Sequence, residues 1–341
     1  DRRFRAFADM VSELTDFMVG GHEPKRTRRR VDDAMDVFEE LGDELGMAWA
    51  EWMRYGVAWF ACRAEEAEAA VRRGAAHAEL AEEEVLAEEL RRSVVSCSFF
   101  GPRHIDETIR AAESLLASYE GHALAAAMAG LSLGGALAVQ GDTDRGRELV
   151  SAANEKRREA GLLVDAAGGT MSASRVEMAA GDLEAAERFL RQGLEELERL
   201  GLGSYYSTAA LMLAEVLERR GRYDEVSRLC PVIRETSDPN DLVNFIGVDA
   251  LEGYLLARDG DLEGGERLAR RAVEQADGID FYDQKGRAFE LLAQTLALAK
   301  KPSEAARAGR DALAIYEVKG DKAATERARE LVASLSDGTA A

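Results

Sequence analysis

One short motif in this chain has the residue pattern of a hydrolase active site. Gly130-Leu131-Ser132-Leu133-Gly134 fits the Gly-x-Ser-x-Gly pattern of a nucleophile elbow. That elbow needs a strand before the serine and a helix after it. Here the motif lies inside an alanine-rich stretch of helical pattern, with no strand signal before it. We therefore interpret it as a chance match and predict a non-enzymatic protein without catalytic residues. An enzyme that uses Ser132 is an alternative, which a serine-directed covalent probe tests.

The chain also lacks the usual sequence signs of metal and nucleotide sites. Its four histidines are dispersed, and no two have the spacing of metal ligands. They are His22, His77, His104 and His122. No glycine is followed by lysine, which excludes the phosphate-binding loop of nucleotide-hydrolysing proteins. We therefore predict neither a metal nor a cofactor.

Charge and cysteine content limit the partners and the compartment. The chain has 341 residues and a formal net charge of −20. Such a chain repels phosphates, so we predict that this region does not bind nucleic acid. Its three cysteines, Cys62, Cys97 and Cys230, are widely separated, and we interpret them as reduced core thiols of a cytoplasmic protein.

One dense basic run, Lys25 to Arg30, stands out against this acidic background. It could contact nucleic acid or an acidic upstream domain. We favour a solvated helix face that pairs with Asp32, Asp33 and Asp36, since a single run is weak evidence in so acidic a chain.

Two features of the sequence bear on targeting, namely its apolar runs and its N-terminus. We find no apolar run of the length that a membrane span needs, and no apolar segment follows Asp1 to Arg5 as in a signal peptide. We therefore predict no membrane partner. The chain begins without Met and already inside a helical pattern, so we expect it to be a piece of a longer protein.

The elements that would position any functional residue repeat with a period of forty. Gly101, Gly141, Gly181 and Gly221 stand one period apart, and a second ladder through Gly121, Gly161 and Gly201 runs half a period out of phase. Such self-similarity is typical of a solenoid. We interpret each period as one helix hairpin, with one glycine in the turn inside the hairpin and another in the turn between hairpins.

The hairpin pattern is clearest at Gly181-Asp182, where one helix ends and the next begins. Glycine suits the left-handed position after a helix, and the carboxylate of Asp182 can accept from the free N–H groups of the next helix. Applied to the whole chain, this pattern predicts a single domain over 1–335 and a disordered tail over 336–341. The expected units are 1–41, 42–81, 82–121, 122–161, 162–201, 202–240, 241–280 and 281–320, with a capping helix over 321–335.

These units resemble tetratricopeptide repeats (TPRs). Gly181-Asp182 and Ala186 match the turn of the family, and Asp238-Pro239-Asn240 matches the tripeptide that closes a repeat. Small residues stand where the family places them in the first helix of a hairpin. These are Gly134, Ser174, Ala214, Gly253 and Ala293. The resemblance implies an all-α, right-handed TPR-like α-solenoid of about eight helical hairpins plus a C-terminal capping helix. The period is longer than the standard unit of the family, and most tryptophan and tyrosine positions of its consensus are unmatched.

Three features indicate a narrower group of proteins within this family. They are the long period, the ending Glu198 to Gly201 and the last unit around Ala312 to Asp321. They resemble the C-terminal repeat region of large bacterial signalling proteins. In those proteins an adenylate/guanylate cyclase domain or a transcription-activator domain precedes an ATPase module and a long repeat array.

The resemblance implies a protein-interaction or sensing module of a bacterial signalling protein, which binds a partner or peptide in its concave groove. The partner could be an upstream domain of the same polypeptide. One alternative is a receptor for a small molecule or peptide that regulates an upstream cyclase, ATPase or transcription domain. Another is a scaffold for homo-oligomerisation.

In this family the first helix of each hairpin lines the concave surface, so the repeat phase predicts the residues of the groove. The expected binding residues are Glu51, Tyr55, Trp59, Arg91, Arg175, Glu215, Tyr254, Arg258, Arg287, Glu290 and Gln294. Arginine, tyrosine and tryptophan carry much of the binding energy at interfaces. Trp52, Tyr55 and Trp59 also share one helical face with core spacing, and packing against the neighbouring hairpin is the interpretation that we favour for them.

Overall fold

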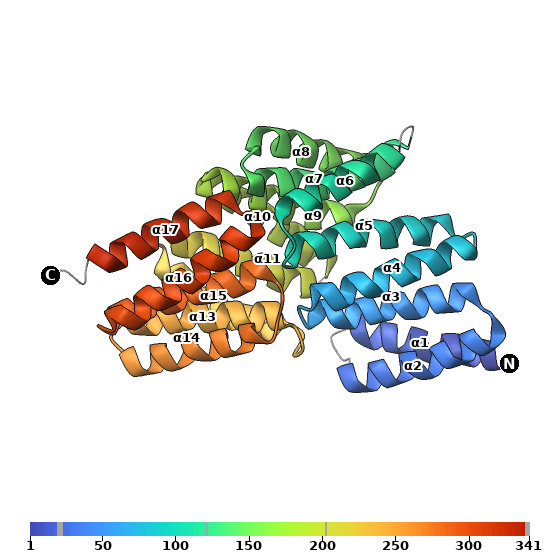
Figure 1. Ribbon diagram of the computed structural model, residues 1–341, viewed down its shortest axis with the longest axis horizontal. Helices are drawn as coiled ribbons and strands as arrows, with labels where there is room; N and C mark the ends of the chain where they lie inside the picture. The colour runs from blue at the N-terminus through green and yellow to red at the C-terminus, as the bar shows by residue number, and fades with distance from the viewer. Residues whose placement is uncertain (19–22, 120–121, 202, 338–341) are drawn as a thin grey trace. The chain divides into compact units, whose positions relative to one another are not determined.

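The computed structural model describes residues 1–18, 23–119, 122–201 and 203–337, and within them it contains seventeen α-helices and no strand (Figure 1). The predicted all-α, TPR-like solenoid with a capping helix is confirmed. The helices are α1 (Arg2–Met18), α2 (Pro24–Leu41), α3 (Glu44–Phe60), α4 (Ala64–Leu80), α5 (Glu84–Phe100), α6 (Ile105–Ser118), α7 (Ala123–Gln140), α8 (Thr143–Glu159), α9 (Leu163–Ala180), α10 (Leu183–Leu200), α11 (Gly203–Arg219), α12 (Tyr223–Thr236), α13 (Leu242–Arg258), α14 (Leu262–Asp277), α15 (Tyr282–Leu298), α16 (Pro302–Lys319) and α17 (Lys322–Asp337).

The glycine turns end the helices as the period predicts. Gly181 has φ 78°, a left-handed conformation that glycine adopts without steric cost, and the side chain of Asp182 accepts a hydrogen bond from the N–H of Ala185 at 2.9 Å. Where the ladder has no glycine, Cys62, Glu82 and Lys300 take the left-handed conformation instead. Gly121 of the second ladder falls within residues 120–121, outside the described residues.

One rung of the glycine ladder is different. Gly101 has an extended backbone, with φ −77° and ψ −175°, and α6 begins only at Ile105. Pro102 follows directly, and the residue before a proline is restricted to extended conformations. The period therefore predicts a left-handed turn at Gly101 that the Gly-Pro sequence prevents.

The contacts divide the chain into two compact units. Unit 1 comprises residues 1–101 together with 238–241, and unit 2 comprises 102–237 and 242–341. Seven of the eight expected hairpins lie within one unit, whereas α5 and α6 fall into different units. The single domain over 1–335 stays a prediction. At its far end α17 includes residues 336 and 337 of the expected tail, and 338–341 lie outside the described residues.

Unit 2 is built in two layers. The odd-numbered helices from α7 to α17 contact one another in succession, whereas the even-numbered helices make their main contacts with their neighbours along the chain. The odd-numbered helices therefore form the inner layer and the even-numbered helices the outer layer.

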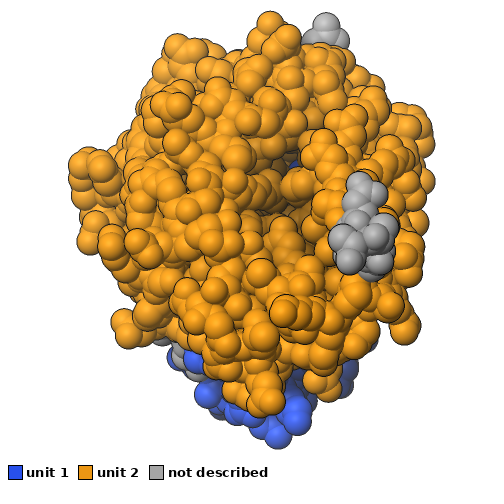
Figure 2. Space-filling view, turned by 90° about the vertical axis from the view of Figure 1, so that its left-hand side faces the viewer, with its two compact units in different colours: residues 1–101, 238–241 blue, residues 102–237, 242–341 orange. Residues whose placement is uncertain are grey.

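The last helix closes unit 2 on itself. α17 packs against α15 and α16, and it also contacts α7 and α9 from the beginning of the unit. Its Ala324 and Ala328 bury against Tyr282 and Tyr316, so the helix covers the last apolar face of the stack. Figure 2 shows unit 2 hollowed at the centre of the face turned to the viewer.

Helix α7 differs from the expectation that no segment could span a membrane. It is long and apolar enough to do so by length and composition, and half of its residues are buried. It packs against α6, α8 and α9, and a core helix with apolar neighbours on several sides acquires the same composition.

Close approach of the two helices of a hairpin depends on small residues. A Cβ atom built on Gly134 would lie 2.9 Å from the carbonyl oxygen of Gly146, and one built on Gly253 would lie 2.7 Å from the backbone N of Ala269. Both glycines stand at the small-residue positions of the TPR resemblance. The backbones of α7 and α8, and of α13 and α14, therefore meet where no side chain intervenes.

Two alanine substitutions in the same helix test this contact. Gly134→Ala is expected to lower the free energy of unfolding by about 1–3 kcal/mol, because α8 must move away. Gly130→Ala is the matched control, since its Cβ would meet only Leu149 Cδ2 at 3.7 Å. The control should be neutral or stabilising by about 1 kcal/mol through helix propensity. Urea denaturation measures both, and equal stabilities would contradict the proposed contact.

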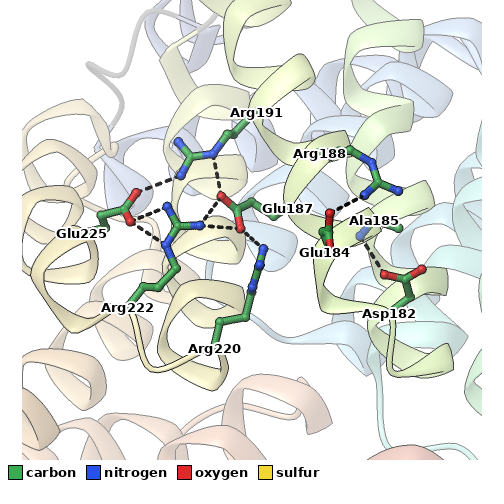
Figure 3. Close-up of polar contacts among 9 residues, drawn as sticks. All are labelled: Asp182, Glu184, Ala185, Glu187, Arg188, Arg191, Arg220, Arg222 and Glu225. Carbon is green, nitrogen blue, oxygen red and sulfur yellow. Dashed lines mark hydrogen bonds and ion pairs between the residues drawn. The ribbon is translucent and has the colours of Figure 1, made fainter.

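Neighbouring hairpins are also joined by charge. The half-exposed Arg191, Arg220 and Arg222 surround the carboxylate of Glu187, which is 7% exposed (Figure 3). Arg191 also bonds Glu225 at 2.9 Å. Burial raises the pKa of Glu187, but its hydrogen bonds from Arg191 and Arg222 outweigh this effect and lower the pKa below its ordinary 4.5. This one carboxylate thus ties α10 to the turn between α11 and α12.

Removing that charge should destabilise the protein. Glu187→Gln is expected to lower the free energy of unfolding by about 1–3 kcal/mol at pH 7. Because the folded pKa is depressed, the contribution is present above pH 4.5 and is lost as the pH falls through the folded pKa, so the two proteins converge in acid. Chemical denaturation as a function of pH measures this. The control is Glu184→Gln, whose exposed pair with Arg188 should contribute about 0.5 kcal/mol or less; an equal loss in both variants would contradict the role of Glu187.

Candidate functional site

Charged side chains gather on the inner layer of unit 2. They come from four odd-numbered helices, and we call them the lumen cluster. Its members are Arg175 of α9, Glu215, Glu218 and Arg219 of α11, Asp283, Arg287 and Glu290 of α15, and Arg327 of α17. Long charged side chains on an inner layer point away from the apolar contacts between the two layers, because their heads need water or a partner.

Ion pairs within the lumen cluster join helices that are not neighbours along the stack. Arg175 Nη1 lies 2.9 Å from Asp283 Oδ2, which connects α9 to α15. Arg287 bonds Glu218, which connects α15 to α11. Partners from three different repeats can meet only inside the closed unit. The cluster therefore spans the interior that the inner helices enclose.

The pair Arg287 and Glu290 forms the buried base of the lumen cluster. Their residues are 5% and 1% exposed, and Arg287 Nη1 bonds Glu290 Oε2 at 2.9 Å. Arg327 Nε adds a bond to Glu290 Oε1 at 3.0 Å. Burial acts to raise the pKa of Glu290, but Arg327 and Arg287 outweigh it, so the pKa is lowered and the carboxylate stays charged.

The edge of the lumen cluster is more accessible than its base. The side chains of Arg175, Asp283 and Arg327 are 27%, 20% and 31% exposed. A ligand that enters the unit would thus meet arginine and carboxylate groups before it reaches the buried pair. Such a mixed lining suits a polar or zwitterionic ligand, because it offers both donors and acceptors.

A smaller group lies at the ends of α12 and α13. The guanidinium carbon of Arg258 stands 3.7 Å from the ring centroid of Tyr223, and the Tyr223 and Tyr254 rings are 6.0 Å apart. Burial, together with a hydrogen bond to Tyr223, raises the pKa of Tyr254 to about 12. Cation–π stacking of this kind orients Arg258 and is worth about 0.5–2 kcal/mol.

Of the residues expected in a groove, the structure brings Arg175, Glu215, Arg287 and Glu290 together in the lumen cluster. Tyr254 and Arg258 form the neighbouring group, and Gln294 follows Glu290 by one turn on α15. Four members of the cluster were not foreseen from the repeat phase. They are Glu218, Arg219, Asp283 and Arg327. Three of these lie three or four residues from an expected position, so helical spacing alone could have found them, whereas Arg327 lies on the capping helix, to which the repeat phase was not applied.

The other expected residues belong to unit 1. Glu51 is 2% exposed and accepts bonds from Arg54 and Arg73 at 2.8 Å, so it ties α3 to α4. Arg91 bonds Glu79 at 2.7 Å and Glu84 at 2.9 Å. These charges serve contacts within unit 1 and are separate from the lumen cluster.

The aromatic residues of α3 are half-buried against the core of unit 1. Trp49, Trp52, Tyr55 and Trp59 pack against a cluster that includes Leu90 and Val71. The Trp59 ring also lies 5.3 Å from the ring of Phe100 on α5. These contacts are those of core packing between hairpins.

The basic run at the start of α2 has different partners from those expected. Arg26 and Arg30 bond the buried Glu13 of α1 at 3.0 and 3.2 Å, and Arg28 lies 3.3 Å from Glu66 of α4. The expected pairing with Asp32, Asp33 and Asp36 is therefore wrong for these three arginines. Burial of Glu13 under α2 is a tertiary contact that helical spacing within α2 does not reveal.

The Gly-x-Ser-x-Gly motif lies wholly inside α7. A continuous helix replaces the strand and sharp turn that a nucleophile elbow requires. Gly134 instead serves the close contact with Gly146. Among the described residues, no group of three or more His, Cys, Asp and Glu side chains is placed to hold a metal ion.

Comparisons with known proteins support the fold. A Rap protein complexed with competence and sporulation factor has a TM-score of 0.59 and 14% identity, over 87% of this chain and 88% of that chain. The apo form of the quorum sensor NprR from B. thuringiensis has a TM-score of 0.53 and 9% identity, over 92% and 88%. At such identities the likeness shows the fold alone. No family profile matches the chain, and no curated protein matches it in sequence.

A substitution at the base tests whether the lumen cluster holds unit 2 together. Arg287→Met is expected to lower the free energy of unfolding by about 3–5 kcal/mol, because Glu218 and Glu290 would lose their buried partner. Thermal and urea denaturation measure this. Arg188→Met, which removes only an exposed pair on α10, is the matched control; an Arg287 variant as stable as this control would contradict the role assigned to the base.

Proposed function

We propose that this chain is a non-enzymatic binding module that holds a peptide or a protein segment inside unit 2, against the lumen cluster. One observation carries the proposal: charged groups from α9, α11, α15 and α17 converge inside a closed unit. A packed core would place apolar residues there, since burial of charges is unfavourable unless a function retains them.

A peptide is the ligand class that fits this lining best. Its backbone offers donors and acceptors at every residue, and arginine and carboxylate side chains on the inner helices can bond both. The two structural neighbours support the same choice, because one is complexed with competence and sporulation factor and the other is a quorum sensor. Those properties belong to the neighbours, and for this chain they motivate the proposal.

Binding would act through the closure of unit 2. α17 contacts α7 and α9, so the two ends of the stack meet. A ligand that bonds Arg175 on α9 and Arg327 on α17 would favour one curvature of the stack over others. In a cytoplasmic signalling protein of bacteria, that curvature would be transmitted to an upstream cyclase, ATPase or transcription domain.

The first experiment is native mass spectrometry of the purified chain mixed with a synthetic pool of short peptides. We expect a subset of the pool to be retained. Arg175→Gln should weaken that retention by about tenfold, because a charge-assisted hydrogen bond is worth roughly 1.5–3 kcal/mol.

Arg188→Gln on the outer helix α10 is the control and should bind as the wild type does. A wild-type chain that retains no peptide would overturn the proposed function. Retention of a small metabolite from the expression host instead would favour the alternative of a small-molecule receptor.

A further inference from the structure

Arg219 differs from the other arginines of the lumen cluster. Arg175, Arg287 and Arg327 each form an ion pair. Within the described part of the chain, the guanidinium of Arg219 has neither an ion pair nor a hydrogen bond, and its Nε atom is enclosed by protein. The enclosed Nε–H donor is left unused, which is unfavourable, whereas the residue as a whole is partly exposed.

The neighbours of Arg219 make its position less favourable still. Burial lowers the pKa of Arg219 to about 10, and the positive charges of Arg327 and Arg287 contribute to the lowering. Arg287 pairs with Glu218 and Glu290, and Arg327 also pairs with Glu290, so both carboxylates already have arginine partners. Among the described residues, Arg219 is thus the arginine of the cluster to which no carboxylate is bonded.

Glu215 is the counterpart of Arg219 on the same helix. It stands four residues earlier on α11, on the same face, and it too has no hydrogen bond or ion pair among the residues that the structure describes. Burial raises the pKa of Glu215, and Arg287 and Arg219 partly offset that rise. A free donor group and a free acceptor group therefore lie side by side, one helical turn apart.

We propose that Arg219 and Glu215 form an anchoring subsite for a carboxylate-bearing peptide, in which Arg219 binds the carboxylate and Glu215 accepts from a neighbouring N–H or amine. A guanidinium fork binds a carboxylate through two parallel hydrogen bonds. A phosphate group has the same oxyanion chemistry, but its greater negative charge would be repelled by Glu215 at a distance of one turn. This subsite rests on the proposed function, because it specifies which peptides the lumen cluster selects.

The test compares three proteins, the wild type, Arg219→Gln and Arg219→Lys, against two forms of one random short-peptide pool and against inorganic phosphate. One form of the pool has free C-terminal carboxylates and the other has C-terminal amides. We expect the wild type to retain peptides enriched in carboxylates. Arg219→Gln should weaken their binding by about tenfold or more, and Arg219→Lys should restore part of it.

The melting temperature of the unliganded protein separates a binding role from a structural one. Because Arg219 has no partner to lose, Arg219→Gln should melt at the same temperature as the wild type or higher. Arg287→Gln, which breaks two buried pairs, should melt lower. A lowered melting temperature of Arg219→Gln would overturn the inference.

The remaining outcomes distinguish the subsite from the proposed function. If the wild type and Arg219→Gln retain the same peptides, the subsite is overturned and the peptide-binding function stands. If no peptide is retained by the wild type, the function itself fails. Phosphate that raises the melting temperature of the wild type, but not of Arg219→Gln, without any retained peptide, would overturn the peptide carboxylate as the occupant.

Discussion

A hairpin of two amphipathic helices cannot bury both of its apolar sides by itself. In this chain each hairpin buries one apolar side internally and the other against its neighbours, so a single hairpin is not stable and the stack is the folding unit. The need to bury these sides determines which helices form the inner layer of unit 2. It also requires something to cover the last hairpin, and α17 does so with Ala324 and Ala328.

The closure of unit 2 brings the two ends of the stack together. α17 covers one end of the stack and simultaneously meets α7 and α9 at the other, so the inner helices face one another across an interior. Arg175 of α9 can then reach Asp283 of α15, although the two residues are 108 positions apart in the chain. The pair Arg287 and Glu290 at the base is largely shielded from solvent, which strengthens the charge interaction between them.

Not all charges inside the protein have the same meaning. Glu51 and Glu187 are carboxylates bonded by arginines. Glu51 joins the two helices of one hairpin, and Glu187 joins α10 to the turn between α11 and α12. Arg219 and Glu215 lie in a comparable environment, but no such partners surround them in the described part of the chain. The contrast between satisfied and unsatisfied groups, rather than charge itself, separates the structural ion pairs from the subsite that we propose.

The period of forty determined most of the architecture. It placed the helix boundaries, because a left-handed glycine followed by a capping aspartate, as at Gly181-Asp182, is a local signal that needs no partner. The TPR resemblance placed Gly134 and Gly253 at small-residue positions, and the structure shows close helix contacts there, since only small residues fit between two backbones. The TPR resemblance, combined with the repeat phase, predicted Arg175, Glu215, Arg287 and Glu290 as groove residues, and in the structure these four belong to the lumen cluster.

Only the tertiary structure decided which of these residues meet. Repeat phase assigned Glu51 and Arg175 to the same kind of position, yet one serves a contact between α3 and α4 and the other reaches across unit 2. The return of α17 to α7 depends on contacts between distant segments, which no periodic signal encodes. The unpaired state of Arg219 also follows from the tertiary structure alone, because the groups around a side chain are known only once every neighbouring helix is placed.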